Sequence, residues 1–207
     1  MITSDEALAR LKEGNTRFVQ GLNSEAETGQ KLRTSLLDGQ EPFAIILGCS
    51  DSRVPAELVF DQGLGDLFVI RVAGNIVAPS QIGSVEFAAD RFGTPLVVVM
   101  GHSQCGAVTA TIEHLQNPTS GASSNLMSIV RRIRPAVAPL FYTELKSSPD
   151  KLLHAAIRSN ISAAKNHLSN GSTILEQLIQ KGDLKVVGAE YSLETGVVDF
   201  FDTTADL

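Results

Sequence analysis

The chain is poor in cysteine and contains no tryptophan. Two cysteines in 207 residues are too few for a secreted disulfide scaffold, and too few for one chain to hold an iron–sulfur cluster with four thiolates. A single disulfide between Cys49 and Cys105 is the simple alternative to two free thiols. We expect reduced cysteines, which are typical of cytoplasmic proteins.

Long hydrophobic runs and a signal peptide are also lacking. The longest apolar runs, Phe43–Leu47 and Leu96–Met100, are far too short to span a bilayer. The first residues, Met1–Glu6, contain neither a basic nor an apolar segment, so we recognise no secretory signal. We therefore expect no membrane partner and a cytoplasmic location.

Positive charge is in short supply. The chain has 17 Lys and Arg against 23 Asp and Glu, which gives a net charge of −6. The densest basic cluster is Arg131, Arg132 and Arg134, which we interpret as one solvated or subunit-facing side of a helix. An acidic chain without a basic stripe is a poor binder of polyanions, so we expect no nucleic-acid partner.

Strands and helices alternate from residue 40 onward. Continuous runs rich in Val and Ile predict strands that are covered on both faces, at Phe43–Leu47, Leu67–Ile70, Leu96–Met100 and, more weakly, Lys185–Ala189. Helices are predicted over Gln81–Arg91, Ala107–Leu115, Asn125–Leu140, Lys151–Leu168 and Thr173–Gln180. This alternation predicts an α/β fold with a mainly parallel sheet and right-handed crossovers. A fifth strand, Gly196–Phe201, follows a short turn and should pair antiparallel.

Two helices are predicted before the first strand. The first carries a capping box formed by Thr3 and Glu6, and the second covers roughly Glu25–Leu37. Neither shows a strong core pattern of its own, so we expect them to pack elsewhere on the fold or on a second subunit. We divide the chain into an N-terminal helical arm, residues 1–39, and an α/β domain, residues 40–207.

The chemically informative residues lie in two turns that follow predicted strands. Residues 48–53 (Gly-Cys-Ser-Asp-Ser-Arg) follow the first strand, and residues 101–106 (Gly-His-Ser-Gln-Cys-Gly) follow the third. Ligands of open parallel sheets bind beyond the carboxyl ends of the strands, where the strand order reverses. If the first and third strands are neighbours, Cys49, His102 and Cys105 converge at that point.

Two thiols and one imidazole that converge are suited to zinc, which favours a tetrahedral set of sulfur, nitrogen and oxygen ligands. Neither turn offers a fourth Cys or His, which indicates an open catalytic position, and Asp51 is also close enough in sequence to reach the metal. Two inert buried cysteines, a disulfide and a catalytic Cys–His pair are the alternatives. A disulfide leaves His102 and Asp51 without a role, and a Cys–His pair does not explain the second cysteine.

The two turns resemble the signature motifs of the β-carbonic anhydrases. The resemblance rests on residues 49–55 (Cys-Ser-Asp-Ser-Arg-Val-Pro) and residues 101–106, and it extends to residues 60–71, 74–75 and 83–87. It is close from about Gln40 to Gly106 and looser toward both ends. These motifs in this order are highly specific.

The resemblance implies one zinc ion per chain, held by Cys49, His102 and Cys105, and the reversible hydration of CO₂ to bicarbonate and a proton. It implies that zinc-bound hydroxide attacks CO₂ while Asp51 and Arg53 orient or gate the zinc site, with Asp51 also able to bind the metal. It further implies four parallel strands with an antiparallel fifth, and a homodimer or homotetramer whose N-terminal helices pack on a partner subunit.

The resemblance also implies substrate contacts. Gln40 matches the family's substrate-facing glutamine, and Phe68 and Gly106 match pocket-lining positions. With Phe68, the side chains of Ala73 and Phe87 would form an apolar wall for a nonpolar gas. Phe87 stands where part of the family has a tyrosine, so a polar contact is absent from that wall.

A second departure concerns regulation. Ile46 stands where some bacterial members carry the tryptophan of a bicarbonate-binding inhibitory pocket, although Arg71 and Tyr191 match its other elements. Two further functions are compatible with the zinc ligands: hydrolysis of CS₂ or COS, and a non-catalytic zinc-binding scaffold. The presence of Asp51 and Arg53 argues against the scaffold, which needs only the metal ligands.

Overall fold

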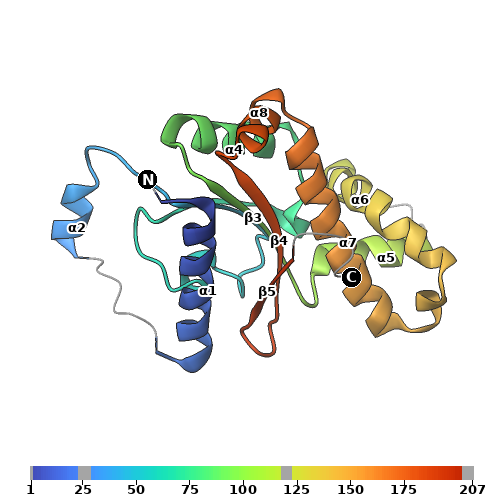
Figure 1. Cartoon of the computed structure of the whole chain (residues 1–207). Coiled ribbons are helices and arrows are strands. Elements are labelled where there is room, and N and C mark those ends of the chain that lie inside the picture. Colours follow the sequence, from blue (N-terminus) through green and yellow to red (C-terminus); the bar gives the residue numbers. More distant parts are fainter. Residues whose placement is uncertain (1, 23–28, 118–122, 202–207) are drawn as a thin grey trace.

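A five-stranded sheet forms the centre of the protein (Figure 1). The computed structural model describes residues 2–22, 29–117 and 123–201. The strand order is β2-β1-β3-β4-β5. The strands are β1 (Ala44–Gly48), β2 (Leu67–Arg71), β3 (Leu96–His102), β4 (Lys185–Tyr191) and β5 (Val198–Phe201). The first four run parallel and β5 pairs antiparallel with β4, which confirms the predicted sheet and the neighbouring positions of β1 and β3.

Helices cover both faces of this sheet (Figure 1). They are α1 (Ser4–Gln20), α2 (Gln30–Ser35), α3 (Ala56–Val59), α4 (Pro79–Phe92), α5 (Gly106–Gln116), α6 (Ser124–Val137), α7 (Pro149–Asn170) and α8 (Thr173–Lys181). Three short 3₁₀ turns accompany them, η1 (Ala73–Asn75), η2 (Ala138–Tyr142) and η3 (Glu144–Ser147). The predicted helices after β2 are present with slightly shifted ends, whereas α3 and the 3₁₀ turns were not predicted. In the part of the chain that the structure describes, no helix is long and apolar enough to cross a membrane.

Strands β1 and β3 are buried along their whole length because each contributes to two separate cores. Ile45 and Leu47 of β1 join the core that α4 to α8 complete, whereas Ala44 and Ile46 face the core completed by α1 and α3. Every residue of β1 and β3 is buried. Full burial of one such aliphatic side chain is worth about 1.5–3 kcal/mol, so these strands fix the framework on which the turns are mounted.

The N-terminal helices begin close to the expected positions. The capping box of α1 is present, with the Thr3 amide donating to the Glu6 carboxylate at 2.7 Å and the Glu6 amide to Thr3 Oγ1 at 3.2 Å. Helix α2 lies within the predicted range Glu25–Leu37, of which residues 25–28 are outside the described residues. No residue of α2 is buried in this chain. Packing of α2 on a partner subunit stays a prediction.

Helix α1 packs on its own chain, which is one of the two placements expected for it, and packing of this helix on a partner subunit stays a prediction. Ala7 and Leu11 are fully buried. The Asn15 carboxamide bonds to three backbone groups of the same chain, at Val59, Gly196 and Val198. The buried stripe of α1 thus includes small and polar residues, which a count of apolar residues does not recognise as a core-facing side.

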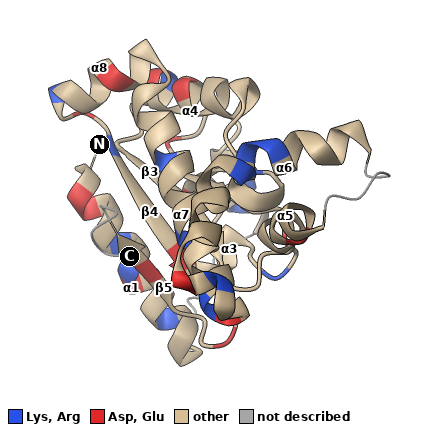
Figure 2. Cartoon of the chain, turned by 90° about the vertical axis from the view of Figure 1, so that its right-hand side faces the viewer, with Lys and Arg blue, Asp and Glu red and all other residues tan. Residues whose placement is uncertain are grey.

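The basic cluster Arg131, Arg132 and Arg134 lies exposed on α6 (Figure 2). The Arg132 guanidinium donates to the Ser128 carbonyl oxygen one turn earlier in the same helix. This placement agrees with the interpretation of the cluster as a solvated or subunit-facing side of a helix.

We expect Gly14→Ala to destabilise the protein. A Cβ at this position would lie 1.8 Å from the carbonyl oxygen of Phe60, directly after α3. The free energy of unfolding should fall by about 1–3 kcal/mol because the backbone must shift, although Ala favours a helix by about 1 kcal/mol over Gly. Urea unfolding followed by circular dichroism measures the change.

Glu13→Ala is the matched control, since Glu13 is the exposed neighbour of Gly14 in α1. It should change the unfolding free energy by no more than about 0.5 kcal/mol. A Gly14→Ala protein as stable as the wild type would contradict the close approach of α1 to the chain at Phe60.

Candidate metal centre

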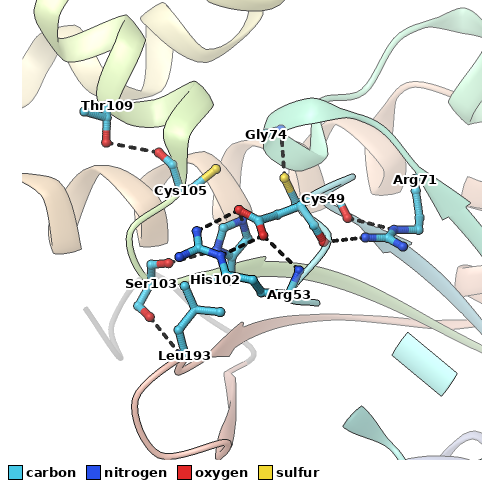
Figure 3. A network of polar contacts seen from close by, with 10 residues as sticks. Cys49, Arg53, Arg71, Gly74, His102, Ser103, Cys105, Thr109 and Leu193 are labelled. Carbon is cyan, nitrogen blue, oxygen red and sulfur yellow. Dashed lines mark hydrogen bonds and ion pairs between the residues drawn. The ribbon is translucent and has the colours of Figure 1, made fainter. Parts of the chain in front are cut away.

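Cys49, His102 and Cys105 meet beyond the carboxyl ends of β1 and β3 (Figure 3). Cys49 follows β1, His102 is the last residue of β3, and Cys105 directly precedes α5. The chain runs from β1 to β2 on one side and from β3 toward β4 on the other, so the two turns diverge and open a crevice. One ligand atom of each residue lies within 4.8 Å of the other two.

A sharp turn brings Cys105 back toward His102. Gln104 has a φ of 57°, a left-handed conformation that residues with a side chain seldom adopt. Cys105 then caps α5, and its carbonyl oxygen accepts hydrogen bonds from the amide and the hydroxyl of Thr109. The Cys105 thiol therefore lies at the amino end of a helix, where the backbone amides favour a thiolate.

The imidazole of His102 is oriented to bind a cation. It is fully buried, and its Nδ1 lies 2.8 Å from the carbonyl oxygen of Ser103. Because a carbonyl oxygen only accepts, Nδ1 carries the proton and Nε2 presents its lone pair. Nε2 is buried without a hydrogen-bond partner among the described residues. Such a group costs about 1–3 kcal/mol, and a metal ion between the three ligands would satisfy it.

The two thiols reinforce this preference for a cation. The Cys105 thiol, hydrogen-bonded to Cys49, lowers the pKa of Cys49 to about 4, in opposition to burial. The same contact, together with burial, raises the pKa of Cys105. The Gly74 amide adds a hydrogen bond to Cys49 Sγ at 3.4 Å. A cation that replaces the proton shared by the pair would stabilise both sulfurs as thiolates. Two thiolates and one imidazole nitrogen are a ligand set that fits zinc.

Asp51 and Arg53 form an ion pair beside the three ligands. Arg53 Nε donates to Asp51 Oδ1 at 2.9 Å and Nη2 donates to Oδ2 at 2.8 Å. This fork holds the pKa of Asp51 well below its usual range, so the carboxylate is ionised at neutral pH. Asp51 Oδ2 lies 3.9 Å from His102 Nε2. The carboxylate thus borders the metal position while both its oxygens bind Arg53, and its predicted role as a metal ligand stays a prediction.

Two predicted substrate contacts are chain neighbours of residues at the metal centre. Gly106 is the first residue of α5 and follows Cys105. Ala73 begins η1 and precedes Gly74, whose amide binds Cys49 Sγ. Both positions are therefore adjacent to residues that form the centre. Their contact with substrate stays a prediction.

Three other predicted contacts lie away from the centre of their own chain. Gln40 precedes β1, whereas Cys49 follows it, and a five-residue strand is roughly 15 Å long. Phe68 pairs with Ile45 near the start of β1, and its ring packs on Phe87 with 6.3 Å between centroids. Phe87 is 53% exposed. One chain alone does not bring these three side chains to the metal ligands.

Sequence reasoning missed residues that act through backbone atoms. Ser103 orients His102 through its carbonyl oxygen, and Gly74 binds Cys49 through its amide. Arg71 was compared only with the family's inhibitory pocket, yet its guanidinium donates to the carbonyl oxygens of Cys49 and Asp51. In the sequence, these three residues could have been recognised only by their positions inside or beside the motifs.

Comparisons with known proteins agree with this site. Residues 44–198 match the family model described as carbonic anhydrase. The chain is 37% identical over 186 residues to carbonic anhydrase 2 of Mycobacterium tuberculosis, with 90% of this chain and 87% of that protein covered. It is 36% identical over 197 residues to a carbonic anhydrase of Mycolicibacterium smegmatis, with 95% and 93% covered.

A solved structure extends the comparison to the fold. The β-carbonic anhydrase CcaA has a TM-score of 0.74 to this chain at 27% identity, and the match covers 94% of this chain and 95% of that one. The chain therefore belongs to the β-carbonic anhydrase family, which confirms the resemblance seen in its motifs. The family depends on zinc, and the cluster of Cys49, His102 and Cys105 is able to hold the ion.

We expect purified protein to contain about one zinc ion per chain, measured by mass spectrometry of the metal. Cys49→Ser should lose most of this zinc on dialysis against a chelator, because a hydroxyl does not replace a thiolate ligand. Acidification of the wild type should also release zinc, since protons compete for both sulfurs.

His114→Ala is the control for zinc content, because His114 lies in α5 outside the cluster. It should retain as much zinc as the wild type. Equal zinc in Cys49→Ser and the wild type after dialysis would show that the metal is held elsewhere.

Proposed function

We propose that this protein is a zinc-dependent lyase that catalyses the reversible hydration of CO₂ to bicarbonate and a proton. One observation carries the proposal: the Asp51–Arg53 ion pair lies beside the three buried ligands. Asp51 Oδ2 is 3.9 Å from His102 Nε2. Membership of the β-carbonic anhydrase family supports the same activity. Zinc, when bound, supplies Lewis acidity that lowers the pKa of a coordinated water molecule toward neutrality.

The residues of this chain then have separate tasks in the reaction. Asp51 is ionised and can accept a hydrogen bond from the attacking water, which aims a lone pair of that water at CO₂. Arg53 binds both carboxylate oxygens and so keeps Asp51 turned away from the ligands. If the ion pair opens, Asp51 is free to approach the metal position and close it.

The neighbouring residues bind the substrate and product. The Gly106 amide lies at the amino end of α5, where the helix dipole favours the negative charge that develops on bicarbonate. Ala73 contributes apolar surface to the wall of the site. These two groups orient the substrate and exclude water from its nonpolar side.

Replacement of Asp51 by Ala separates an enzyme from a zinc scaffold. We expect Asp51→Ala to lower kcat for CO₂ hydration by about 10²-fold or more, because a positioned proton acceptor typically contributes 10²–10⁴-fold. Its zinc content should equal that of the wild type. Stopped-flow hydration of CO₂ at alkaline pH measures the rate.

Glu113→Ala is the matched control, since it removes another carboxylate, on α5, and should leave kcat unchanged. Wild-type protein with a full zinc content but no CO₂ hydration would contradict the proposed reaction. Turnover of CS₂ or COS by the same preparation would then assign the site to a related hydrolase.

We further propose that the working unit is a homodimer or homotetramer. Gln40, Phe68 and Phe87 can contact substrate only if a second copy brings them to a metal centre, because Gln40 and Phe68 lie at the end of β1 and β2 that is opposite the ligands and Phe87 packs on Phe68. An apolar patch supports this arrangement: Phe87 packs edge-on against Phe92 at 5.4 Å between ring centroids and is half exposed, beside the edge strand β2. A second copy would cover such a surface.

The N-terminal arm has a place in this proposal. We keep the division into residues 1–39 as the arm and residues 40–207 as the zinc domain, with α2 as the part of the arm that packs on the partner. A cytoplasmic location belongs to the same proposal, since both free cysteines must remain reduced to bind zinc.

Mixing two impaired variants tests whether each active site is shared between two chains. We expect Gln40→Ala and Asp51→Ala to be impaired separately, and a mixture that has exchanged subunits to regain CO₂ hydration. In a mixed dimer, one site combines the intact Asp51 of one chain with the intact Gln40 of the other. Unfolding and refolding the two variants together, followed by stopped-flow assay, measures the recovery.

The separately refolded variants, mixed only in the assay, provide the control. If co-refolding gives no recovery while sedimentation shows mixed oligomers, Gln40 does not serve the site of another chain. A purely monomeric wild type with full activity would contradict the proposal in the same way.

A further inference from the structure

Arg71 makes two contacts that the proposed reaction has not used. It is the last residue of β2 and pairs in register with Gly48, the last residue of β1. Its Nε donates to the carbonyl oxygen of Cys49 at 2.9 Å, and its Nη2 donates to that of Asp51 at 2.6 Å (Figure 3). We propose that Arg71 is a positioning residue that sets the location of the turn from Cys49 to Asp51 relative to the other two metal ligands.

Apart from Arg71, backbone amides at and after the end of β2 donate the hydrogen bonds that join this part of the described chain to the turn. The Val72 amide donates to the Gly48 carbonyl oxygen at 3.1 Å, and the Gly74 amide donates to Cys49 Sγ at 3.4 Å. Neither of the two donors is a side chain. In the described chain, Arg71 is the one side chain from outside the turn that hydrogen-bonds to the carbonyls of Cys49 and Asp51. A substitution of Arg71 therefore removes both of these hydrogen bonds to the turn and leaves the backbone contacts in place.

The guanidinium group is suited to this task. Its planar fork presents several N–H donors in a fixed geometry, whereas a lysine ammonium is a flexible point charge. Arg71 forms no ion pair with a carboxylate among the described residues. Both of its hydrogen bonds go to neutral carbonyl oxygens, and hydrogen bonds from a charged donor are stronger than neutral ones. The side chain thus holds the backbone of the turn instead of neutralising an acid.

Arg71 and Arg53 hold Asp51 at different atoms. Arg53 binds the carboxylate, whereas Arg71 binds the carbonyl oxygen, which also accepts from the Val54 amide at 3.0 Å. Loss of Arg71 would leave the carboxylate fork intact but allow the whole turn to shift. Cys49 and Asp51 would then move together relative to His102 and Cys105, which belong to a different turn. Both zinc retention and catalysis should suffer.

Chemical rescue of Arg71→Ala tests the proposal on zinc-loaded protein. Replacing a group that supports metal ligands typically costs about 10–100-fold in metal affinity or activity. We expect Arg71→Ala to transfer zinc to a chelator faster than the wild type by a factor in that range. The kcat for CO₂ hydration should fall while KM changes little, because the effect is on geometry. Millimolar guanidinium chloride should restore part of both properties by occupying the vacated position.

Two further variants make the result decisive. Arg134→Ala removes an exposed arginine of α6 and should match the wild type with and without guanidinium. Arg71→Lys keeps the charge but not the fork, and should lie between Arg71→Ala and the wild type. Zinc transfer unchanged in Arg71→Ala would overturn the proposal. Faster zinc transfer that guanidinium reverses in neither Arg71→Ala nor Arg71→Lys would also overturn it, because general destabilisation of the protein gives that result.

The inference rests on the proposed zinc enzyme, but its test is separable from that function. Zinc transfer to a chelator is measured without CO₂. If the wild type fails to hydrate CO₂, the reaction is wrong while the comparison of zinc transfer between Arg71 variants still decides the role of this side chain.

Discussion

The pairing of β1 with β3 is the constraint on which the metal centre depends. Gly48 pairs with Met100 at the end of this ladder, so Cys49 leaves the sheet close to the level at which β3 ends with His102. Cys49 and His102 are therefore brought together by backbone register. A slip of one residue would turn every side chain to the opposite face, and the apolar residues of both strands would then face the wrong core. The hydrophobic core thus specifies the geometry of a polar site.

Charge is arranged around the centre so that its anionic groups are balanced from outside. The Cys49 thiolate and the Asp51 carboxylate are negative groups close to His102, and Cys105 would become a third once a metal ion binds. The amino end of α5 approaches Cys105, and Arg53 binds Asp51. Burial makes an unpaired charge costly. The stability of the site therefore depends on where its positive groups lie more than on how many there are. Each positive group is attached to one particular negative group, which leaves His102 Nε2 and the sulfurs directed at the metal position.

The fold and the metal ligands could be predicted from the sequence because both are carried by side-chain identity. Continuous apolar runs rich in Val, such as Leu96–Met100, favour a strand covered on both faces. The packing of α1 could not be predicted, because its contacts depend on Gly14 and on the hydrogen bonds of Asn15. Helix α3 was missed because four residues are too few to show a period.

Support of the ligands was the least visible feature in the sequence. Ser103 and Gly74 act through a carbonyl and an amide, which every residue other than proline possesses. Only a three-dimensional arrangement shows which backbone group is near which ligand. Arg71 could be recognised as a basic residue at a strand end. Its two acceptors are the carbonyl oxygens of Cys49 and Asp51, and the side chains of these residues do not indicate the contact.

The position of Gln40 has a consequence for how metal binding and catalysis depend on assembly. The three ligands come from one chain, so zinc binding requires only the intact sheet of that chain. Gln40 precedes β1 and Phe68 lies near the start of β2, and the parallel strands all begin at the end of the sheet opposite the ligands. If these side chains contact substrate, catalysis belongs to the oligomer while metal binding belongs to the monomer. Dilution below the dissociation constant of the oligomer would then abolish turnover before zinc is lost, and this order of events distinguishes a shared site from one that is complete within each chain.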